Sequence, residues 1–376
     1  MAWSLLRSRS RNPIPHHGKS RSQSQSRSRS RRRAAVLAAA AALAVGLAAS
    51  PANAAAGWES LPPPPAYDNV KLLPFDSQNS YATTKSSCWG CGAQEELWQR
   101  SGSTWKKLTP PADAAAQTLA GTGPDDLWAI GRKDLSSGVW HVHHYDGTKW
   151  SADLHPDTRN LEIRDAEAVS RTSLWGVGNN RTGGWAPTVT HWDGRTWNTT
   201  TFPVNGGLDA VDVRSENDIW AAGYRSDGGV PAAYDPLVMH YDGTRWSEVP
   251  LPGIPGENDA LRTVFSNGPN DVWVASDSHE WHWDGTAWAR RDLPGAGYGT
   301  TFARYGGQVY AGTQVADVRD PKLLRWSGTS WVADTSLTKG TSVRELSSSP
   351  DGALYAVSQS LSAPYTFLSR LAPPAS

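Results

Sequence analysis

Histidine is the side chain in this sequence whose spacing most suggests metal chemistry. Ten histidines occur, and His141-Val142-His143-His144 is the densest group. His141 and His143 lie on the same side of an extended chain and could bind one metal ion. The sequence identifies no acidic partner and no supporting hydrogen-bonding group for such an ion. No metal ion and no cofactor is therefore predicted.

Histidine and aspartate also recur at fixed positions of a repeat. The repeated histidines are His144, His191, His240 and His282, and the repeated aspartates are Asp146, Asp193, Asp242 and Asp284. Members of each set belong to separate repeats, too dispersed to hold one ion or to act as the paired carboxylates that hydrolyse glycosides. Each aspartate precedes a glycine in a tight turn, where its side chain bonds backbone N–H groups. Both sets are predicted to be structural.

The two cysteines form the motif Cys88-Trp89-Gly90-Cys91. Redox catalysis favours a first cysteine at a helix N-terminus, whereas Cys88-Trp89 aligns with the strand that contains Leu127-Trp128. A fully extended strand would hold the two Cα atoms ~10 Å apart, too far to bridge. Gly90 and Gly92 could relax the segment into a turn. A local structural disulfide between Cys88 and Cys91 is predicted over redox catalysis.

Aromatic and charged side chains gather in segments that break the repeat, such as residues 132–138, 179–186, 224–236 and 313–321. These segments are expected on one face of the fold, opposite short and uniform turns. Loops positioned by a rigid scaffold are where binding residues concentrate. Aromatic rings there could stack on sugars, and charged groups could bond hydroxyls. The candidate ligand-binding residues are Trp185, Arg181, Tyr224, Arg225, Asp227, Tyr234, Asp235, Asp259, Arg262 and Tyr298.

The charges are segregated along the chain, although 36 basic and 36 acidic residues give 376 residues a formal net charge of zero. Residues 1–54 contain ten basic residues and no acidic one, so the remainder is acidic, with 26 basic and 36 acidic residues. An acidic body argues against a nucleic-acid or anionic-membrane binder. Two cysteines exclude a disulfide scaffold and a multi-cysteine metal site.

Residues 1–54 have the order of a cleavable export signal. Arg31-Arg32-Arg33 precedes an apolar run over 34–49, and cleavage near Ala54 fits an Ala-x-Ala pattern. The run is too short for a membrane span of ~20 residues. Ser30-Arg31-Arg32 resembles the twin-arginine motif, so the twin-arginine and general secretory routes both stay open. An RNA-binding tail over 7–33 and an uncleaved anchor are the alternatives.

Residues 55–376 are built from a repeat. The motif His-[Tyr/Trp]-Asp-Gly-x-x-Trp starts at residues 144, 191, 240 and 282, with weaker copies around Gly102 and Gly328. The turn glycines are 42 to 49 residues apart, a period of solenoids, propellers or arrays. In one copy four strands are predicted, at 261–265, 271–275, 280–283 and 287–292, separated by Gly, Pro, Asn and Asp clusters. A four-stranded antiparallel unit at this period is a propeller blade.

The two ends of this body predict how the ring closes. The last copy has three strands, at 343–346, 353–357 and 365–371, and Gly57–Pro62 resembles the fourth-strand segment Arg245–Pro250. We therefore predict one all-β domain. It is a seven-bladed β-propeller of four-stranded antiparallel blades whose ring is closed by the N-terminal strand, which leaves no long exposed sheet edge.

The repeat resembles the kelch motif, because Trp or Tyr on the second strand is followed by Tyr-Asp or Trp-Asp before a turn and by Trp after it. That resemblance implies a propeller like the kelch-type domain of galactose oxidase, although the kelch Gly-Gly doublet is clear only at Gly306-Gly307. The Asp-Gly-x-x-Trp turn also looks like a shortened Asp-box of sialidase propellers, without the Phe/Tyr-Arg-Ile-Pro motif of those enzymes. The repeats are similar overall to secreted bacterial propellers with Asn-Asp-x-Trp and Trp-Asp-Gly-x-x-Trp motifs. Such motifs specify a fold and carry no chemistry.

The sequence favours a secreted, extracellular, non-catalytic binding module that recognises carbohydrate or cell-wall polysaccharide through the variable loops. Two alternatives stay open. One is a secreted glycosidase or polysaccharide lyase with carboxylates at the channel mouth, for which Asp165, Asp209 and Asp259 are candidates. The other is a cell-surface protein–protein interaction scaffold. No catalytic residue is predicted, and the expected partners are carbohydrate or a surface protein. Neither nucleic-acid binding nor membrane insertion of the mature chain is expected. The mature chain is expected to be a monomer.

Overall fold

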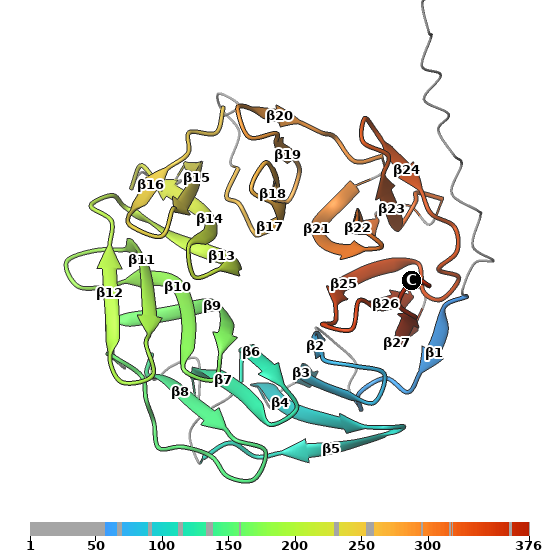
Figure 1. Cartoon of the computed structure of the whole chain (residues 1–376), viewed down its shortest axis with the longest axis horizontal. Helices are drawn as coiled ribbons and strands as arrows, with labels where there is room; N and C mark the ends of the chain where they lie inside the picture. The colour runs from blue at the N-terminus through green and yellow to red at the C-terminus, as the bar shows by residue number, and fades with distance from the viewer. Residues whose placement is uncertain are drawn as a thin grey trace, which may run out of the picture. The chain divides into compact units, whose positions relative to one another are not determined.

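Antiparallel strands make up all the regular structure of the part of the chain that the computed structural model describes. These residues are 57–65, 70–88, 92–111, 116–132, 138–157, 159–228, 233–252, 259–294, 296–315, 317, 319–360 and 363–375. They contain 27 strands and no helix, in seven sheets arranged around a central axis (Figure 1). Among these residues there is thus no helix with the length and apolar character to cross a membrane.

Each sheet is one blade, and the chain completes one blade before it enters the next. Blade 1 has β2 (Lys71–Pro74), β3 (Asn79–Cys88), β4 (Gly92–Ser101) and β5 (Thr104–Leu108). Blade 2 has β6 (Thr118–Gly123), β7 (Asp126–Arg132) and β8 (Trp140–Tyr145). Blade 3 has β9 (Leu161–Ser170), β10 (Ser173–Asn180), β11 (Ala186–Trp192) and β12 (Trp197–Thr201). Blade 4 has β13 (Gly206–Ser215), β14 (Asp218–Ser226), β15 (Tyr234–Tyr241) and β16 (Trp246–Glu248).

The same order continues in the C-terminal half of the ring. Blade 5 has β17 (Thr263–Gly268), β18 (Asp271–Ala275), β19 (Glu280–Trp283) and β20 (Trp288–Arg290). Blade 6 has β21 (Ala296–Tyr305), β22 (Gln308–Val315), β23 (Leu323–Trp326) and β24 (Trp331–Ala333). Blade 7 has β25 (Ser342–Ser348), β26 (Leu354–Ser360) and β27 (Ala363–Leu371), joined by β1 (Glu59–Leu61).

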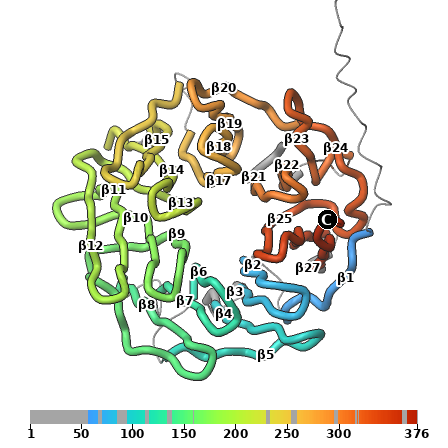
Figure 2. Tube along the Cα trace, in the orientation of Figure 1, coloured from blue at the N-terminus to red at the C-terminus, as the bar shows by residue number. Residues whose placement is uncertain are grey.

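The N-terminal strand closes the ring, as predicted. β1 pairs antiparallel with β27, with Glu59 opposite Arg370 and Leu61 opposite Leu368. Figure 2 shows this blue strand beside the red C-terminal strands. The seven-bladed all-β propeller expected from the repeat is therefore confirmed.

Blade 2 departs from the four-strand pattern. A single bridge, Tyr145 to Trp150, stands where its fourth strand would begin. Beyond this bridge, side chains replace part of the backbone pairing. The Ser151 hydroxyl accepts the His144 N–H at 2.9 Å, and the Asp153 carboxylate accepts the Val142 N–H at 3.0 Å.

Blade 1 differs from the sequence alignment in register. The prediction that Cys88-Trp89 occupies the aromatic position of the second strand was wrong. Tyr81 holds that place, just after the turn in which the Phe75 N–H bonds the Asn79 carbonyl, whereas Cys88 ends β3 and lies opposite Gly92. β3 and β4 are longer than the repeat predicts, so Cys88 lies at the end of β3 and not just after the turn at its start. The predicted Cys88–Cys91 disulfide lies outside the described residues.

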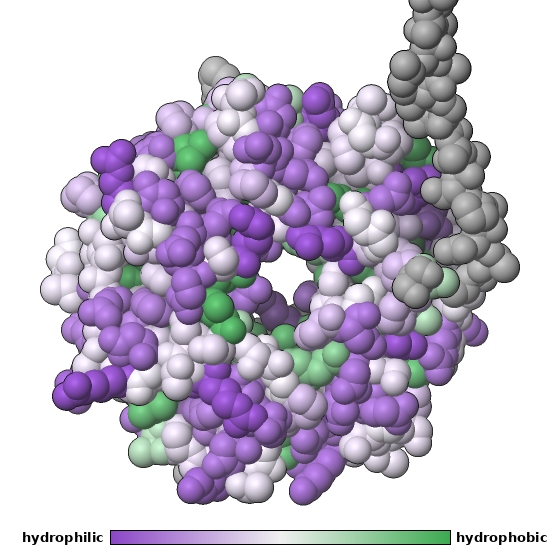
Figure 3. Space-filling model, in the orientation of Figure 1, coloured by the Kyte–Doolittle hydropathy of each residue, from purple (hydrophilic) through white to green (hydrophobic). Residues whose placement is uncertain are grey.

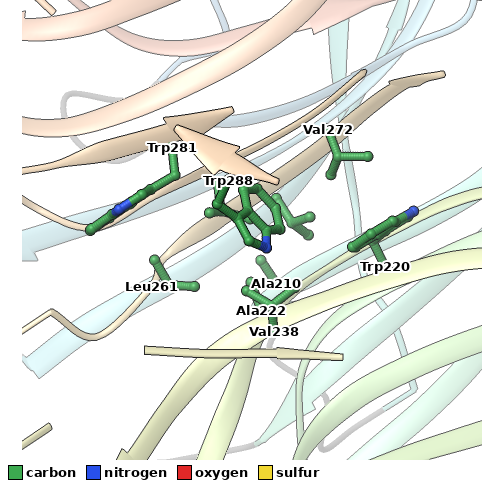
Figure 4. Close-up of a cluster of buried hydrophobic side chains, with 10 residues drawn as sticks. Ala210, Trp220, Ala222, Val238, Leu261, Val272, Trp281 and Trp288 are labelled. Atoms are coloured by element: carbon green, nitrogen blue, oxygen red, sulfur yellow. The ribbon is translucent and has the colours of Figure 1, made fainter. Parts of the chain in front are cut away.

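Apolar side chains bury the seams between neighbouring blades. Seven buried clusters lie among the described residues, and each one joins two adjacent blades. In Figure 4, Trp220 and Val238 of blade 4 meet Leu261, Trp281 and Trp288 of blade 5. An aromatic residue from the second strand of each blade enters the seam with the next blade. These residues are Tyr81, Trp128, Trp175, Trp220, Trp273, Tyr310 and Tyr355.

The repeated histidines stack on the seam tryptophans of blades 2 to 5, so their predicted structural role is confirmed. His282 stacks on Trp273 with ring centroids 4.2 Å apart, while its Nε2 lies 2.8 Å from an Asp271 oxygen. His144 and His240 bond an aspartate in the same way, and His191 bonds the Ser173 hydroxyl. Burial alone would raise the pKa of Asp271, yet hydrogen bonds from His282, Asn267 and Trp273 hold that pKa below its ordinary value.

The repeated aspartates shape the turns between third and fourth strands. One Asp146 oxygen accepts the N–H groups of Thr148 and Lys149, each at 2.9 Å, and the Thr148 hydroxyl. These hydrogen bonds lower the pKa of Asp146 to about 2. Gly147 follows with a φ of 89°, which only glycine adopts without strain. The predicted turn role of the aspartates is confirmed.

The seam aromatics are expected to dominate stability. Trp273 is fully buried, so Trp273→Ala should lower the free energy of unfolding by about 3–5 kcal/mol, as for other large-to-small core changes. Trp185→Ala is the control, because this ring is 48% exposed and surface changes usually cost less than ~0.5 kcal/mol. Urea unfolding followed by circular dichroism measures both variants. Equal losses in the two variants would refute the role assigned to the seams.

Candidate functional site

The irregular connections of the propeller lie on one face, which we call the loop face. Because neighbouring strands are antiparallel, the first strand of a blade starts there, the second ends there, the third starts there and the fourth ends there. The Asp-Gly turns occupy the opposite face. Residues 181–185, which join β10 to β11, and residues 202–205, which join blade 3 to blade 4, are both on the loop face.

A cavity of about 420 Å³ opens on the loop face between blades 3 and 4. We call it the aromatic pocket. The structure brings three predicted residues together in it, Trp185, Tyr224 and Tyr234. The rest of its lining, which the sequence did not single out, is Arg164, Gly184, Asn205, Gly206, Ser226 and Gly228.

The aromatic rings of the pocket have fixed orientations. Tyr224 and Tyr234 meet edge to face, with ring centroids 4.9 Å apart and planes at 74°. Trp185 is 48% exposed, and the Arg181 guanidinium lies 4.7 Å from its ring centroid. Both contacts are favourable for these ring and charge types. The pocket therefore presents an exposed indole beside a braced pair of tyrosines.

Backbone contacts anchor the pocket across two blades. The Gly206 N–H donates to the Trp185 carbonyl at 2.9 Å, which ties the β10–β11 connection to the start of β13. Gly206 has a φ of 147°, and a Cβ there would lie 2.0 Å from the Tyr224 carbonyl oxygen. Any other residue at position 206 would push these strands apart.

A chain of ion pairs runs from the aromatic pocket toward the central channel. Arg181 bonds Glu162 at 2.7 Å, and the same carboxylate lies 3.4 Å from Arg164. Arg164 and Arg262 both bond Asp209. Burial alone would lower the pKa of Arg164, but Asp209 and Glu162 raise it. These side chains are fixed by their partners before any ligand arrives.

The other predicted ligand residues lie outside the pocket lining. Arg225 pairs with Glu248, and Asp227 accepts the Ala233 N–H at 3.0 Å. Asp235 is exposed and lies opposite Arg225 in the register. Arg262 lies at the channel mouth. The side chain of Tyr298 lies outside the described residues.

Asp259 supports the pocket from behind. It is buried, and one of its oxygens bonds the Ser276 hydroxyl at 3.0 Å and the His279 ring at 2.8 Å. Its backbone N–H donates to the Tyr234 carbonyl at 3.1 Å. Asp259 thus positions Tyr234 and is enclosed by protein.

The central channel is lined by charged groups. An opening remains at the centre of the ring in the space-filling view (Figure 3), and a cavity of about 400 Å³ at the channel mouth includes Lys71, Asp165 and Glu345. Enclosure by the seven inner strands raises the pKa of Glu345 to about 7, against the lowering effect of Lys71. Asp165 is the largest influence on Lys71 and raises its pKa.

Polar side chains in the channel also bond the neighbouring inner strand. Asp165 accepts the Val211 N–H at 3.0 Å, and Glu167 accepts the Val213 N–H at 2.6 Å. On the other side of the ring, the Thr263 hydroxyl donates to the Thr300 carbonyl at 2.9 Å. The carboxylates therefore link β9 to β13, and the Thr263 hydroxyl links β17 to β21, in each case the innermost strands of neighbouring blades.

The similarity of the chain to known proteins lies in its fold. No protein family model matches the chain, and no curated protein sequence matches it. The solved structure of YCF48 bound to D1 peptide is similar over 86% of this chain and 99% of that chain, with a TM-score of 0.55 and 15% identity.

Two further structures show the same likeness at lower identity. The extracellular domain of BT4673 from B. thetaiotaomicron matches over 83% of this chain and 40% of that chain, with a TM-score of 0.55 and 11% identity. The β-propeller domain of the Trilobed protease from Pyrococcus furiosus matches over 80% and 92%, with a TM-score of 0.52 and 9% identity. That domain has an open velcro topology, whereas β1 closes the ring here.

Two channel carboxyl groups should make the fold less stable as pH rises. Burial, followed by the neighbouring Asp212, raises the pKa of Glu167 well above its ordinary value, and burial raises the pKa of Asp212 to about 7. In the unfolded chain both groups titrate near pH ~4. Between pH ~4 and the raised native pKa values, the native state therefore binds more protons than the unfolded chain. The stabilisation that these protons give is lost as pH rises through about 7.

Glu167→Gln keeps an oxygen acceptor for the Val213 N–H but cannot ionise. We expect this variant to be more stable than the natural chain at about pH 8, by roughly 1 kcal/mol, and to show a flatter decline of stability between about pH 5 and pH 8. Urea unfolding at a series of pH values measures the effect. The exposed Asp235→Asn should leave the profile unchanged, and a destabilised Glu167→Gln at pH 8 would contradict the expectation.

Proposed function

We propose that this protein is a secreted, non-catalytic binding module that holds carbohydrate in the aromatic pocket. The observation that carries the proposal is the meeting of Trp185, Tyr224 and Tyr234, contributed by two blades, in one cavity of about 420 Å³. Sugar rings stack their C–H faces on aromatic side chains, and their hydroxyls need hydrogen-bonding partners. Arg164, Asn205 and Ser226 place such partners around the rings.

The geometry of Trp185 suits a stacking platform. Arg181 lies over one face of the indole, so a sugar ring would stack on the other. The backbone bond from Gly206 and the ion pair of Arg181 with Glu162 hold this platform before binding. A site that is ordered in advance loses less conformational entropy on binding, which favours affinity.

The proposal includes export of the chain. Residues 1–54 would be removed near Ala54 by either of the two secretory routes that their sequence fits. It also includes an origin of the blades from a kelch-like or Asp-box-like repeat, supported by the recurring His-[Tyr/Trp]-Asp-Gly-x-x-Trp turns. The extracellular origin of the BT4673 domain agrees with such a location.

A peptide is the second candidate ligand, because the similar YCF48 propeller was solved with a peptide bound. An aromatic pocket also accepts apolar or proline side chains, so this alternative uses the same residues. The enzyme alternative has less support. Asp165, Asp209 and Asp259 each have structural partners, namely a backbone N–H, two arginines and a Ser–His pair.

Binding to a panel of glycans and polysaccharides tests the proposal with the purified mature chain. Trp185→Ala and Tyr234→Ala should each weaken binding by about tenfold, which corresponds to ~1.4 kcal/mol of lost stacking. The control is Val332→Ala, because Val332 is also an exposed apolar residue but belongs to β24 in blade 6.

Three results of the same panel would contradict parts of the proposal. Released product would establish an enzyme. Binding to peptides alone, weakened by the same two aromatic variants, would assign the pocket to a peptide. Carbohydrate binding that neither aromatic variant changes would move the site away from the aromatic pocket.

A further inference from the structure

We propose that His141, His143 and Asp153 form a binding site for one divalent transition-metal ion on blade 2. One potential ligand atom from each of these residues lies within 4.8 Å of the other two. Among the described residues this is the one such group of histidine, cysteine and acidic side chains. The site shares no residue with the aromatic pocket, so it is independent of the carbohydrate proposal.

Strand geometry brings the two histidines together. They are two positions apart on β8 and therefore lie on the same side of the sheet. Their rings are nearly parallel, at 15°, with centroids 6.1 Å apart. Pairs of imidazoles at this spacing can converge on one ion through one nitrogen each.

The acidic partner comes from the irregular segment that replaces the fourth strand of blade 2. Asp153 Oδ2 lies 2.7 Å from His141 Nδ1. Its other oxygen accepts the N–H groups of Val142 at 3.0 Å and His155 at 3.1 Å, which fix the carboxylate in place. The Ser151 carbonyl lies 3.3 Å from His143 Nδ1 and orients that ring. These are the acidic partner and supporting groups that the sequence alone did not reveal.

The corresponding positions of the next two blades along the chain carry no histidine. The positions of His141 and His143 in blade 3 are Thr188 and Thr190, whose hydroxyls bond Thr201 and Thr199 on the adjacent strand. The histidine that serves the fold in blade 2 is His144, which stacks on Trp128. Two histidines and a carboxylate thus stand in blade 2 where blade 3 has threonines, and blade 2 is the one described blade that lacks a regular fourth strand.

Two imidazoles and one carboxylate make a donor set that suits Zn²⁺ and neighbouring metals. The ion would replace the hydrogen between His141 Nδ1 and Asp153 Oδ2, and the ring proton would move to the other nitrogen of His141. Three protein ligands leave the fourth position of a tetrahedral ion open to water or to a ligand. The side chains of His141 and Asp153 are 16% and 31% exposed, so the ion has access from solvent.

Zinc titration of the untagged full chain tests the site. His16 and His17 are replaced by glutamine throughout, so that this adjacent pair does not contribute. We expect one zinc ion per chain by calorimetry after EDTA treatment, with an increase in Tm that EDTA reverses. Co²⁺ in place of Zn²⁺ should give the visible absorption of a four-coordinate site.

Two variants separate metal binding from folding. Asp153→Asn keeps the oxygen that accepts the Val142 N–H, and His141→Gln changes a partly exposed side chain. Each should weaken zinc binding by at least about tenfold, with an unchanged circular dichroism spectrum of the metal-free protein. His240→Gln is the matched control, because it removes a histidine on the third strand of another blade, and it should bind zinc as before.

The proposal is overturned if zinc in molar excess neither binds nor raises Tm. It is also overturned if Asp153→Asn and His141→Gln bind zinc as tightly as the parent chain. Should one of them fail to fold, the other carries the test.

Discussion

The packing of one aromatic ring per blade into the seam with the next blade is the constraint on which this structure depends. A single four-stranded blade has two faces and too few residues to bury either of them alone. Each blade instead contributes one large aromatic side chain, from Tyr81 in blade 1 to Tyr355 in blade 7, and the next blade covers it. In blades 2, 4 and 5, a histidine stacked on that side chain and an aspartate bonded to the histidine hold the aromatic ring at a fixed angle. Stability is therefore a property of neighbouring pairs around the closed ring.

This arrangement leaves the loop face free to vary. Most seam residues lie within the strands, and the Asp-Gly turns lie on the opposite face. The connections on the loop face add single apolar residues to the seams, such as Leu261, Leu293 and Leu337, and are otherwise irregular. The aromatic pocket and the irregular segment of blade 2 are both departures from a regular repeat. Natural proteins tend to break their own local rules where function requires it. The two proposed sites therefore lie where the chain departs from the sequence and structure of its own repeat.

Much of the fold could be predicted from the sequence, because the features that specify it are periodic. Trp128 and Trp220, the Asp-Gly turns and the fourth-strand likeness of residues 57–62 all repeat a local pattern that is visible without coordinates. Tyr81 was not predicted because its blade has longer strands, which place Cys88 rather than Tyr81 near the expected repeat position. The repeat thus predicts architecture well and fails where one copy changes length.

The sites were only partly predictable for a different reason. Trp185, Tyr224 and Tyr234 stood out as aromatic residues in irregular segments. Arg164 belongs to the inner strand β9, next to the buried apolar residues Leu161 and Ile163, a pattern that indicates a structural role. Its place in the aromatic pocket follows only from how the blades are arranged around the central axis. The segment that contains Asp153 folds back beside β8 through side-chain hydrogen bonds that no repeat pattern encodes.

The pairing of β1 with β27 has a consequence for how this chain must fold. It joins residues about three hundred positions apart, so the ring has no native closure until nearly all of the chain is available. Contacts this distant in sequence form slowly, since the entropy of closing the loop is lost before the pairing is gained. A partly synthesised chain is an open arc with an unpaired edge at β27 or earlier, and such edges invite association with other chains. The pairing of the short strand β1 with β27 therefore ends the stage of folding in which that sheet edge is open to association with other chains.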